Sequence, residues 1–287
     1  MLALHSLLLL LLGAVATAAA AAVEPRGLVT QYPGTNLLEA RYPNAITARY
    51  NSTVMVLPIA RSLAQSLVPA GVSLLPTHPV PGLAADQWPL VLQAGLDQDL
   101  HSNGLPAGDF YVTRLAVPWT DQSGDGKTPF IHQPALALSI DVLPLFTRVL
   151  TAARLVYSLF TPNPGASADL GGGREGSSAK TLLGKLVYDI NVARTAPGQE
   201  KYSLDLFLDF ANQGYANATL NSCVYHPTTY DLPETNPYFV TGDVTLGNAF
   251  VPGLAQTFKN VQGLRAGEHF LETLFQPCVG TAKFPSS

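Results

Sequence analysis

The chain has 287 residues, a formal net charge of −4 and 13% charged residues. Its 16 lysines and arginines are scattered rather than clustered, which excludes nucleic acid as a partner and argues against an anionic membrane surface. A hydrophobic fraction of 47% with 24 glycines and 23 prolines indicates a compact, turn-rich chain of the all-β or α+β type.

The first 22 residues have the form of a secretory signal peptide. A leucine run at 7–12 gives way to alanines ending at Ala22, and a polar chain begins with Glu24. No lysine or arginine precedes the apolar run, so an uncleaved signal anchor is the alternative. We expect cleavage after residues 1–22, one mature domain over 23–287, no stable membrane association after cleavage, and a secreted or endomembrane-lumen location.

The next elements are mostly strands, with a short helix at 61–67. A longer helix is predicted to begin at Asp141, which can cap it, with Pro144 in the first turn. It continues to Leu159, because apolar residues recur at helical spacing over that stretch. Strands in this half are predicted at 45–59, 90–94, 110–117 and 135–140.

Residues 161–180 are rich in proline, glycine and serine. Such a segment offers little apolar surface to bury, so it is predicted to be a mobile surface loop within the domain. Its three glycines at 171–173 do not follow a strand and open a helix, and a phosphate-binding loop is therefore not indicated.

Alternation with a period of two predicts strands at 182–192 and 202–210. The stretch at 195–199 between them has turn composition, so the two strands are predicted to form a long antiparallel hairpin. The remaining elements are a strand at 238–246 and short helices at 254–261 and 268–275.

Two sequence features are typical of an exported chain. Cys223 and Cys278 are the only cysteines and are predicted to form one disulfide, with a reactive thiol as the alternative. Asn51 and Asn217 begin glycosylation sequons, and Asn221 begins a weaker third; a used acceptor must face solvent.

No Cys/His set has zinc-ligand spacing, the five histidines after residue 23 are predicted to be surface or hydrogen-bonded residues, and we expect neither a metal nor a cofactor.

Several segments line up in order with one known family. Residues 41–75 are predicted to form a strand, a short helix and a Pro-Ala-Gly turn, followed by the strand at 109–118 and by Pro129-Phe130-Ile131-His132. The match ends with Arg154-Leu155-Val156-Tyr157-Ser158-Leu159 and the strand up to Val192. This order resembles the acetoacetate decarboxylase-like superfamily. The resemblance implies a mostly antiparallel, α+β fold: a closed or cone-shaped β-barrel with an apolar interior and a few outer helices.

The chemistry of that family is a Schiff base on a lysine, which desolvation and a neighbouring cation keep neutral. Here Thr161 stands where the resemblance places the lysine, and Thr113 stands at the position of a family glutamate. Arg154 matches the family's helix arginine. If residues 161–180 are an insertion, Lys185 can take the place of the lysine; the alternative is a solvated strand lysine. The catalytic residues are therefore unknown, and Lys185 and Arg154 are the candidates.

We expect binding, or conversion without Schiff-base decarboxylation, of a small apolar or keto-type molecule. One alternative is a lyase or decarboxylase using Lys185, and another is a non-catalytic structural or interaction glycoprotein. A cavity of several hundred Å3 favours a ligand, and a lysine inside that cavity favours the lyase.

Overall fold

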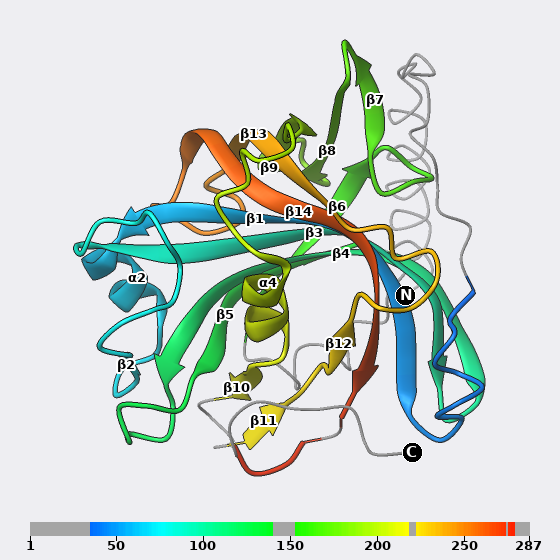
Figure 1. The fold of residues 1–287 in the computed structure, drawn as a ribbon, viewed down its shortest axis with the longest axis horizontal. Helices are drawn as coiled ribbons and strands as arrows, with labels where there is room; N and C mark the ends of the chain where they lie inside the picture. The colour runs from blue at the N-terminus through cyan, green and yellow to red at the C-terminus, as the bar shows by residue number, and fades with distance from the viewer. Residues whose placement is uncertain (1–34, 140–152, 218–221, 274, 279–287) are drawn as a thin grey trace, which may run out of the picture.

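The structure is a computed structural model that describes residues 35–139, 153–217, 222–273 and 275–278. The expected signal peptide lies outside these ranges. All the described strands belong to one sheet, and the described helices are short (Figure 1). Within the described residues, no helix has the length and apolar character needed to cross a membrane.

Four long strands form the central part of the sheet. They are β1 (Ile46–Ala60), β3 (Gln87–Ser102), β4 (Leu105–Asp121) and β14 (Gln256–Glu272). β1 lies between β3 and β14 and is antiparallel to both, and β4 continues the sheet beyond β3. Helix α2 (Arg61–Leu67) follows β1 directly, and the short β2 (Ser73–Leu74) pairs with β4.

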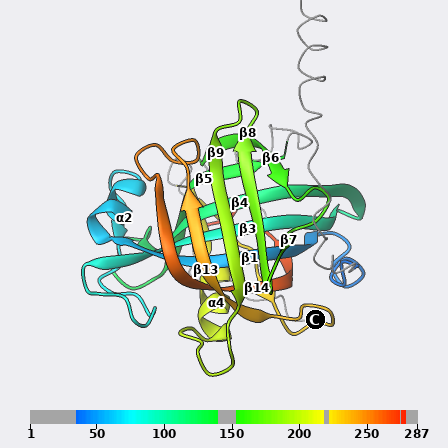
Figure 2. The same ribbon diagram turned by 90° about the horizontal axis from the view of Figure 1, so that it is seen from above.

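Five further strands close the sheet into a barrel. They are β5 (Phe130–Leu138), β6 (Arg154–Thr161), β8 (Arg174–Thr181), β9 (Leu186–Arg194) and β13 (Tyr238–Leu246). β5 pairs with both β4 and β6, so the ring runs β5-β6-β8-β9-β13-β14-β1-β3-β4 and back to β5. Only the β5–β6 pair of this ring is parallel, and Figure 2 shows β8, β9 and β13 crossing over the long strands. The expected mostly antiparallel barrel with few outer helices is confirmed.

Additional elements lie beside the ring. β7 (Ala168–Gly171) pairs with β8. β10 (Gly214–Asn217) extends the sheet at one end of β5, β11 (Ser222–Val224) pairs with β10, and β12 (Thr228–Thr229) pairs with the end of β14. Helix α4 (Leu204–Ala211) lies on the same side of the sheet as these three strands (Figure 1).

Side-chain alternation separates an inner from an outer face of the ring. Arg265 of β14 lies 3.3 Å from Glu175 of β8, and these strands are not neighbours in the ring. Side chains of strands that are not neighbours in the ring can meet only across its interior, so Arg265 belongs to the inner face. Glu268 lies three residues further along β14, and side chains at an odd spacing point to opposite faces, so Glu268 belongs to the outer face. The outer face here is the one that α4 and β12 cover.

Residues 202–210 were expected to form a strand, and this expectation is wrong. Leu204–Ala211 is helical, because the Ser203 side chain accepts a 3.3 Å hydrogen bond from the Leu206 amide and Asp205 occupies the first turn. Phe207, the exception to the two-residue period, is buried on the face that packs against β1 and β3, where the remaining gap measures about 10 Å3. The expected hairpin is therefore absent, and β9 pairs with β8 and β13 instead.

Three other helices expected from the sequence are also absent, because the residues that the structure describes there lie in strands. Residues 154–159 lie in β6, and the stretches 256–261 and 268–272 lie in the single strand β14. β14 is buried along most of its length, and polar residues such as Arg265 and Glu268 are buried beside the apolar ones, so its sequence shows no clear two-residue period. The start of the expected helix, at 141–152, lies outside the described residues.

The expected loop at 161–180 is likewise wrong. It contains β7 and β8, and β8 is a member of the ring that pairs with both β6 and β9. The glycines at 171–173 have φ of 81°, 63° and 75°, which fits the tight turn between the two strands. β8 gains order from its neighbours in the sheet rather than from its own composition.

The expected disulfide is confirmed. Cys223 and Cys278 are bonded with a Cα–Cα distance of 5.0 Å, and backbone hydrogen bonds of 2.8 and 3.1 Å join Cys223 to Gln276. The Cys223 side chain is buried, so the bond ties the C-terminal segment to the β10–β11 edge.

Candidate functional site

A group of polar side chains lies on the outer face of the ring, on the side that α4 covers, and all of them are buried except the half-buried Arg114. Strand register gathers it, because Tyr50 on β1 pairs with Glu268 on β14 and with Asp97 on β3. We call this group the Glu268 cluster; its members are Tyr50, Ser52, Gln93, Asp97, Arg114, Tyr215, Tyr230 and Glu268.

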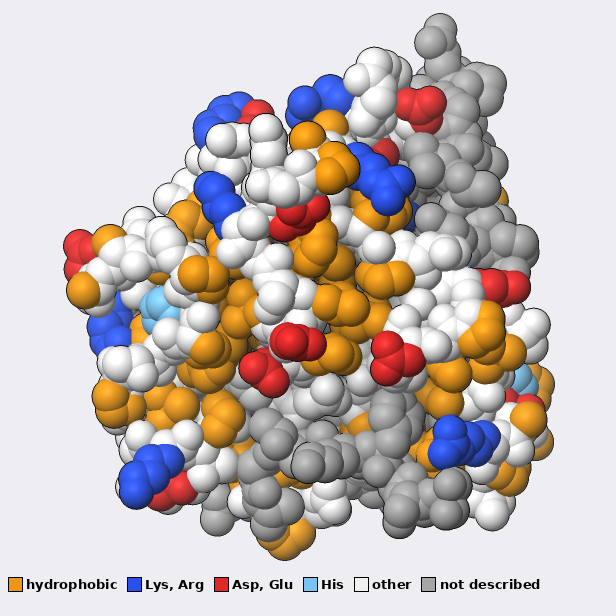
Figure 3. Space-filling view, in the orientation of Figure 1, with side chains coloured by type: hydrophobic (Ala, Val, Ile, Leu, Met, Phe, Trp, Pro, Cys, Tyr) orange, Lys and Arg blue, Asp and Glu red, His pale blue; other side chains and the backbone are white. Residues whose placement is uncertain are grey.

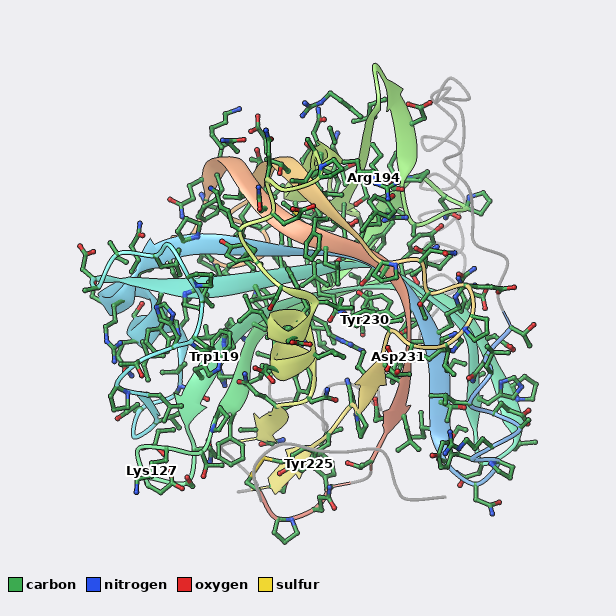
Figure 4. All side chains as sticks on the ribbon, in the orientation of Figure 1. Trp119, Lys127, Arg194, Tyr225, Tyr230 and Asp231 are labelled. Atoms are coloured by element: carbon green, nitrogen blue, oxygen red, sulfur yellow. A yellow bond between two sulfur atoms is a disulfide. The ribbon has the colours of Figure 1, made fainter. Side chains whose placement is uncertain are left out.

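Glu268 contacts three other polar side chains of the cluster and is 2% exposed. The Tyr230 hydroxyl donates a 2.8 Å hydrogen bond to its Oε2 atom, and the Gln93 side-chain amide donates to its Oε1 atom. The Ser52 hydroxyl lies 3.5 Å from the same Oε1 atom. Figure 4 shows Tyr230 between α4 and β14, so one donor comes from the covering layer and the other two come from the sheet.

Burial changes the proton affinity of both carboxyl groups in the cluster. It raises the pKa of Glu268 to about 7, and the hydrogen bond from Tyr230 and the charge of Arg114 offset this only in part. Burial likewise raises the pKa of Asp97 to about 7. Both groups can therefore gain and lose a proton near neutral pH, as general acids and bases require.

Arg114 brings a permanent positive charge to the cluster. It faces Gln93 across the β3–β4 pair. Its guanidinium carbon lies 5.2 Å from the ring centre of Tyr50, 6.0 Å from that of Tyr215 and 5.8 Å from that of Phe270. Burial disfavours its charged form, but neighbouring acidic groups, Tyr215 and Asp97 first among them, outweigh burial, so the pKa of Arg114 stays above its usual value. Arg114 is half-buried, whereas the other members of the cluster are buried.

A histidine–carboxyl pair borders the cluster, and burial lowers the pKa of its histidine, His226. Nε2 of His226 lies 2.9 Å from Oε2 of Glu272. The His226 ring contacts Tyr215, with ring centres 4.8 Å apart, and also Phe270. Burial favours a neutral Glu272, but His226 and Arg114 outweigh it and lower the pKa of that carboxyl. Glu272 thus supplies a fixed negative charge beside Arg114.

This arrangement can bind a small anion and exchange a proton with it. A guanidinium is suited to a carboxylate, and a carboxyl with a pKa near 7 is suited to proton transfer at a neighbouring atom. No group of three or more His, Cys, Asp or Glu side chains in the described part of the chain is placed to hold a metal ion.

The interior of the ring holds a different polar group that is already internally paired. The Arg265 guanidinium, besides its contact with Glu175, donates hydrogen bonds to Thr53 at 2.8 Å and to Asn51 at 3.3 Å. The Tyr238 hydroxyl donates to Glu175 at 2.7 Å. Such a closed set of charges and donors indicates a structural role.

Thr113, which stands at the family glutamate's position, also faces this interior and is fully buried. Two residues away on the same strand, Tyr111 stacks on Phe160 with ring centres 5.1 Å apart. Thr161 is exposed at the end of β6. The two positions that the resemblance assigns to catalysis are therefore not brought together.

Lys185 and Arg154 are both exposed, and both line one open surface groove of about 480 Å3 at the ends of β6 and β8. They lie on the outside of the barrel. All lysines in the described part of the chain are exposed, namely Lys127, Lys180, Lys185, Lys201 and Lys259. No described lysine thus occupies a dry interior position of the kind that the family chemistry needs.

The acceptor asparagines do not have the solvent exposure that glycosylation requires, contrary to expectation. Asn51 is 1% exposed and Asn217 is 2% exposed. The side-chain oxygen of Asn51 accepts a hydrogen bond from Arg265 inside the barrel, so this asparagine has a role in the core. Of the histidines expected to be at the surface or hydrogen-bonded, His132 and His269 are buried, and burial lowers the pKa of each to about 4. Both ring nitrogens of His269 lack a hydrogen-bond partner, so the expectation is wrong for this residue.

The members of the Glu268 cluster were missed in the sequence. Glu268 fell within a predicted helix, which hid its pairing with Tyr50. A signal was present, because Arg114 interrupts the apolar strand at 110–117 and Asp97 ends another apolar run. A charge inside a strand that is apolar on both sides indicates a buried polar group.

No family model and no curated protein matches the chain in sequence. Among solved structures it is similar to MppR, an enduracididine biosynthesis enzyme, complexed with pyruvate, with 13% identity and a TM-score of 0.51 over 82% of this chain and 91% of that one. MppR with the condensation product of pyruvate and imidazole 4-carboxaldehyde gives 12% identity and a TM-score of 0.50 over 81% and 88%. An acetoacetate decarboxylase-like enzyme from Sphingomonas wittichii RW1 gives 13% and 0.46 over 92% and 99%. At this level of identity the likeness concerns the fold alone, and the chain shares the fold of MppR.

Proposed function

We propose that this protein binds a small keto-type carboxylate at the Glu268 cluster and exchanges protons with it, without forming a Schiff base. The observation that carries the proposal is a half-buried guanidinium, Arg114, close enough for its charge to act on a buried carboxyl group, Glu268, whose pKa is about 7. We further propose that it acts as a single domain outside the cytoplasm, which the signal-like N-terminus and the disulfide support.

Arg114 supplies the recognition step. Its guanidinium offers several N–H donors in one plane, a geometry that matches the two oxygens of a carboxylate. Aromatic rings hold the guanidinium in place, so little side-chain freedom remains to be lost on binding. The same rings provide the apolar walls that a short carbon chain needs.

Glu268 supplies the proton step. In its ionised form it can take a proton from the carbon next to the ketone, which leaves an enolate, and in its protonated form it can return that proton. The nearby positive charge of Arg114 stabilises the negative charge that develops on the substrate. No electrons are transferred and no group leaves, so the cycle needs no cofactor.

The comparisons support this class of ligand by analogy. MppR, which has the same fold, is described in complexes with pyruvate and with a pyruvate condensation product. The exposed position of Lys185 supports a reaction without an imine, and the lyase alternative lacks a buried amine among the described residues.

Pyruvate is the probe for the test. We expect saturable binding by calorimetry and exchange of the methyl protons for deuterium, followed by NMR in heavy water. Glu268→Gln should keep binding and lose exchange, and Arg114→Met should lose both. Arg194→Met, at an exposed arginine that lies over the Tyr238 ring, is the matched control and should behave as the unaltered protein.

Two outcomes would overturn the proposal. One is binding that Arg114→Met leaves unchanged while that variant remains folded. The other is a stable adduct on Lys185 after borohydride treatment with pyruvate, abolished by Lys185→Ala, which would restore the lyase.

A further inference from the structure

The turn between β8 and β9 presents two leucines to solvent. Leu182 is 59% exposed and Leu183 is 85% exposed, and Leu159 on the neighbouring β6 is 49% exposed. Singly exposed leucines are common, but three on adjoining strand ends form a patch.

The turn holds its leucines in fixed positions. The Gly184 amide donates to the Thr181 carbonyl at 2.8 Å, and the Thr181 amide donates to the Lys185 carbonyl at 2.8 Å. The Lys185 amide also donates to the Thr181 hydroxyl at 3.2 Å. Gly184 has a φ of 75°, which this tight turn requires and glycine adopts without strain. The leucines therefore project from a closed, hydrogen-bonded turn.

Three cations surround this patch. Lys180 and Lys185 flank the two leucines along the chain, and Arg154 lines the groove beside them. Lys180 is paired with Leu159 in the β6–β8 register, so charge and apolar surface alternate at this edge. One aspartate lies near these cations: Asp189 of β9 is exposed, and the positive charge of Lys180 acts on its carboxyl group. Three cations against this one aspartate still give this edge a net positive charge in a chain whose net charge is −4, and we call it the basic edge.

The apolar surface continues from the turn into the groove. Leu155, Val156 and Ala249 line the groove together with Leu182 and Leu183. Figure 2 places the β8–β9 turn and α4 at opposite ends of the molecule. Figure 3, which views the α4 face, shows acidic side chains near its centre and lysines and arginines toward its margins. The basic edge is therefore separate from the Glu268 cluster.

We propose that the β8–β9 turn docks this protein onto an anionic lipid bilayer. Leu182 and Leu183 enter the interfacial region, while Lys180, Lys185 and Arg154 lie at the level of the lipid phosphates. Apolar side chains at a projecting tip with flanking cations match the apolar and charged layers of such a surface. Their charge complementarity favours a membrane over a protein partner. This inference goes beyond the proposed function and against the expectation from sequence, in which the three cations were scattered.

Vesicle flotation of the full chain tests the docking. We use phosphatidylcholine vesicles with and without phosphatidylserine. The protein should float with the anionic vesicles, and added salt should weaken binding. Lys180→Ala/Lys185→Ala should weaken it by about fivefold for each lysine removed. Leu182→Ser/Leu183→Ser should weaken it by at least ~10-fold, because the apolar contribution is lost.

Leu105→Ser is the matched control. Leu105 is 71% exposed at the start of β4, so its replacement removes a comparably exposed leucine outside the patch. It should bind vesicles as the unaltered protein does, and circular dichroism verifies that all variants are folded. The inference is overturned if the unaltered protein does not float with anionic vesicles. It is also overturned if Leu182→Ser/Leu183→Ser floats as well as Leu105→Ser, which would point to a protein partner or to no partner for this turn.

Discussion

The Tyr230 hydroxyl donates a 2.8 Å hydrogen bond to Glu268, and this bond joins the segment after β12 to the C-terminal part of β14. Burial raises the pKa of Tyr230 well above its usual value, so the phenol stays protonated and acts as a donor throughout the accessible pH range. Glu268 can change its charge near neutral pH whereas Tyr230 cannot. The strength of this bond therefore depends on the protonation state of the glutamate alone.

The first prediction concerns stability against pH. The folded pKa of Glu268 is raised from 4.5 to about 7, so the folded state holds its proton more tightly than the unfolded state does. The resulting stabilisation is complete below about pH 4.5 and is lost as the pH rises through about 7. Glu268→Gln should abolish this loss, which is on the order of 3 kcal/mol.

Denaturant unfolding of the unaltered protein and of Glu268→Gln between pH 5 and pH 8 measures this difference in pH-dependent stability. The buried histidines make the protein more stable as the pH rises toward their usual pKa, which is the opposite direction. Both proteins contain these histidines, so their contribution cancels in the comparison. Equal pH dependence in the two proteins would mean that Glu268 does not titrate in this range.

The second prediction concerns Tyr230 itself. Tyr230→Phe removes the hydroxyl and leaves one carboxylate oxygen with one donor fewer. At pH 8, where Glu268 is ionised, we expect a loss of about 1.5–3 kcal/mol, as for a hydrogen bond to a charged group. At pH 5 the loss should be smaller, because the neutral carboxyl needs the donor less. Tyr157→Phe, at a half-buried tyrosine of β6, is the control and should show no such pH dependence.

The third prediction concerns the ion pair inside the ring. The side chains of Arg265 and Glu175 are 2% and 10% exposed. Arg265→Met leaves Glu175 as a buried charge without its cation and should cost about 3–5 kcal/mol. Glu175→Gln added to Arg265→Met should recover part of that loss, since it removes the unpaired charge. Strictly additive effects in this double-mutant cycle would contradict the pairing.

The fold was largely predictable, and the candidate site was not. Short strands with clear flanking turns, such as 238–246, and the helix at 61–67 coincide with β13 and α2. The errors have two physical causes. β14 is buried on both faces, so its residues lack the alternation that marks a strand, and Leu204–Ala211 carries apolar residues that satisfy both a two-residue and a helical period.

The site depends on contacts that no local pattern records. Tyr50 and Glu268 are separated by most of the chain and meet only through the β1–β14 register. The resemblance directed attention to Thr113 and Thr161, because it follows the family's chemistry rather than the polar groups of this chain. Gathering Arg114, Asp97 and Glu268 on one face requires the order of four strands, and sequence alone leaves that order open.

The last prediction concerns the disulfide. It closes a loop with a sequence separation of 55 residues, for which loop entropy suggests about 4 kcal/mol. Because β11 is the last strand at this edge of the sheet, loss of the bond should also loosen the edge locally. Cys223→Ala/Cys278→Ala should therefore unfold at a lower temperature and be cleaved by protease near β11 before the barrel is cut. Non-reducing peptide mapping of the unaltered protein should recover the linked peptides. An unchanged melting temperature after reduction would mean that the pairing of Cys223 with Gln276 is sufficient to hold this edge.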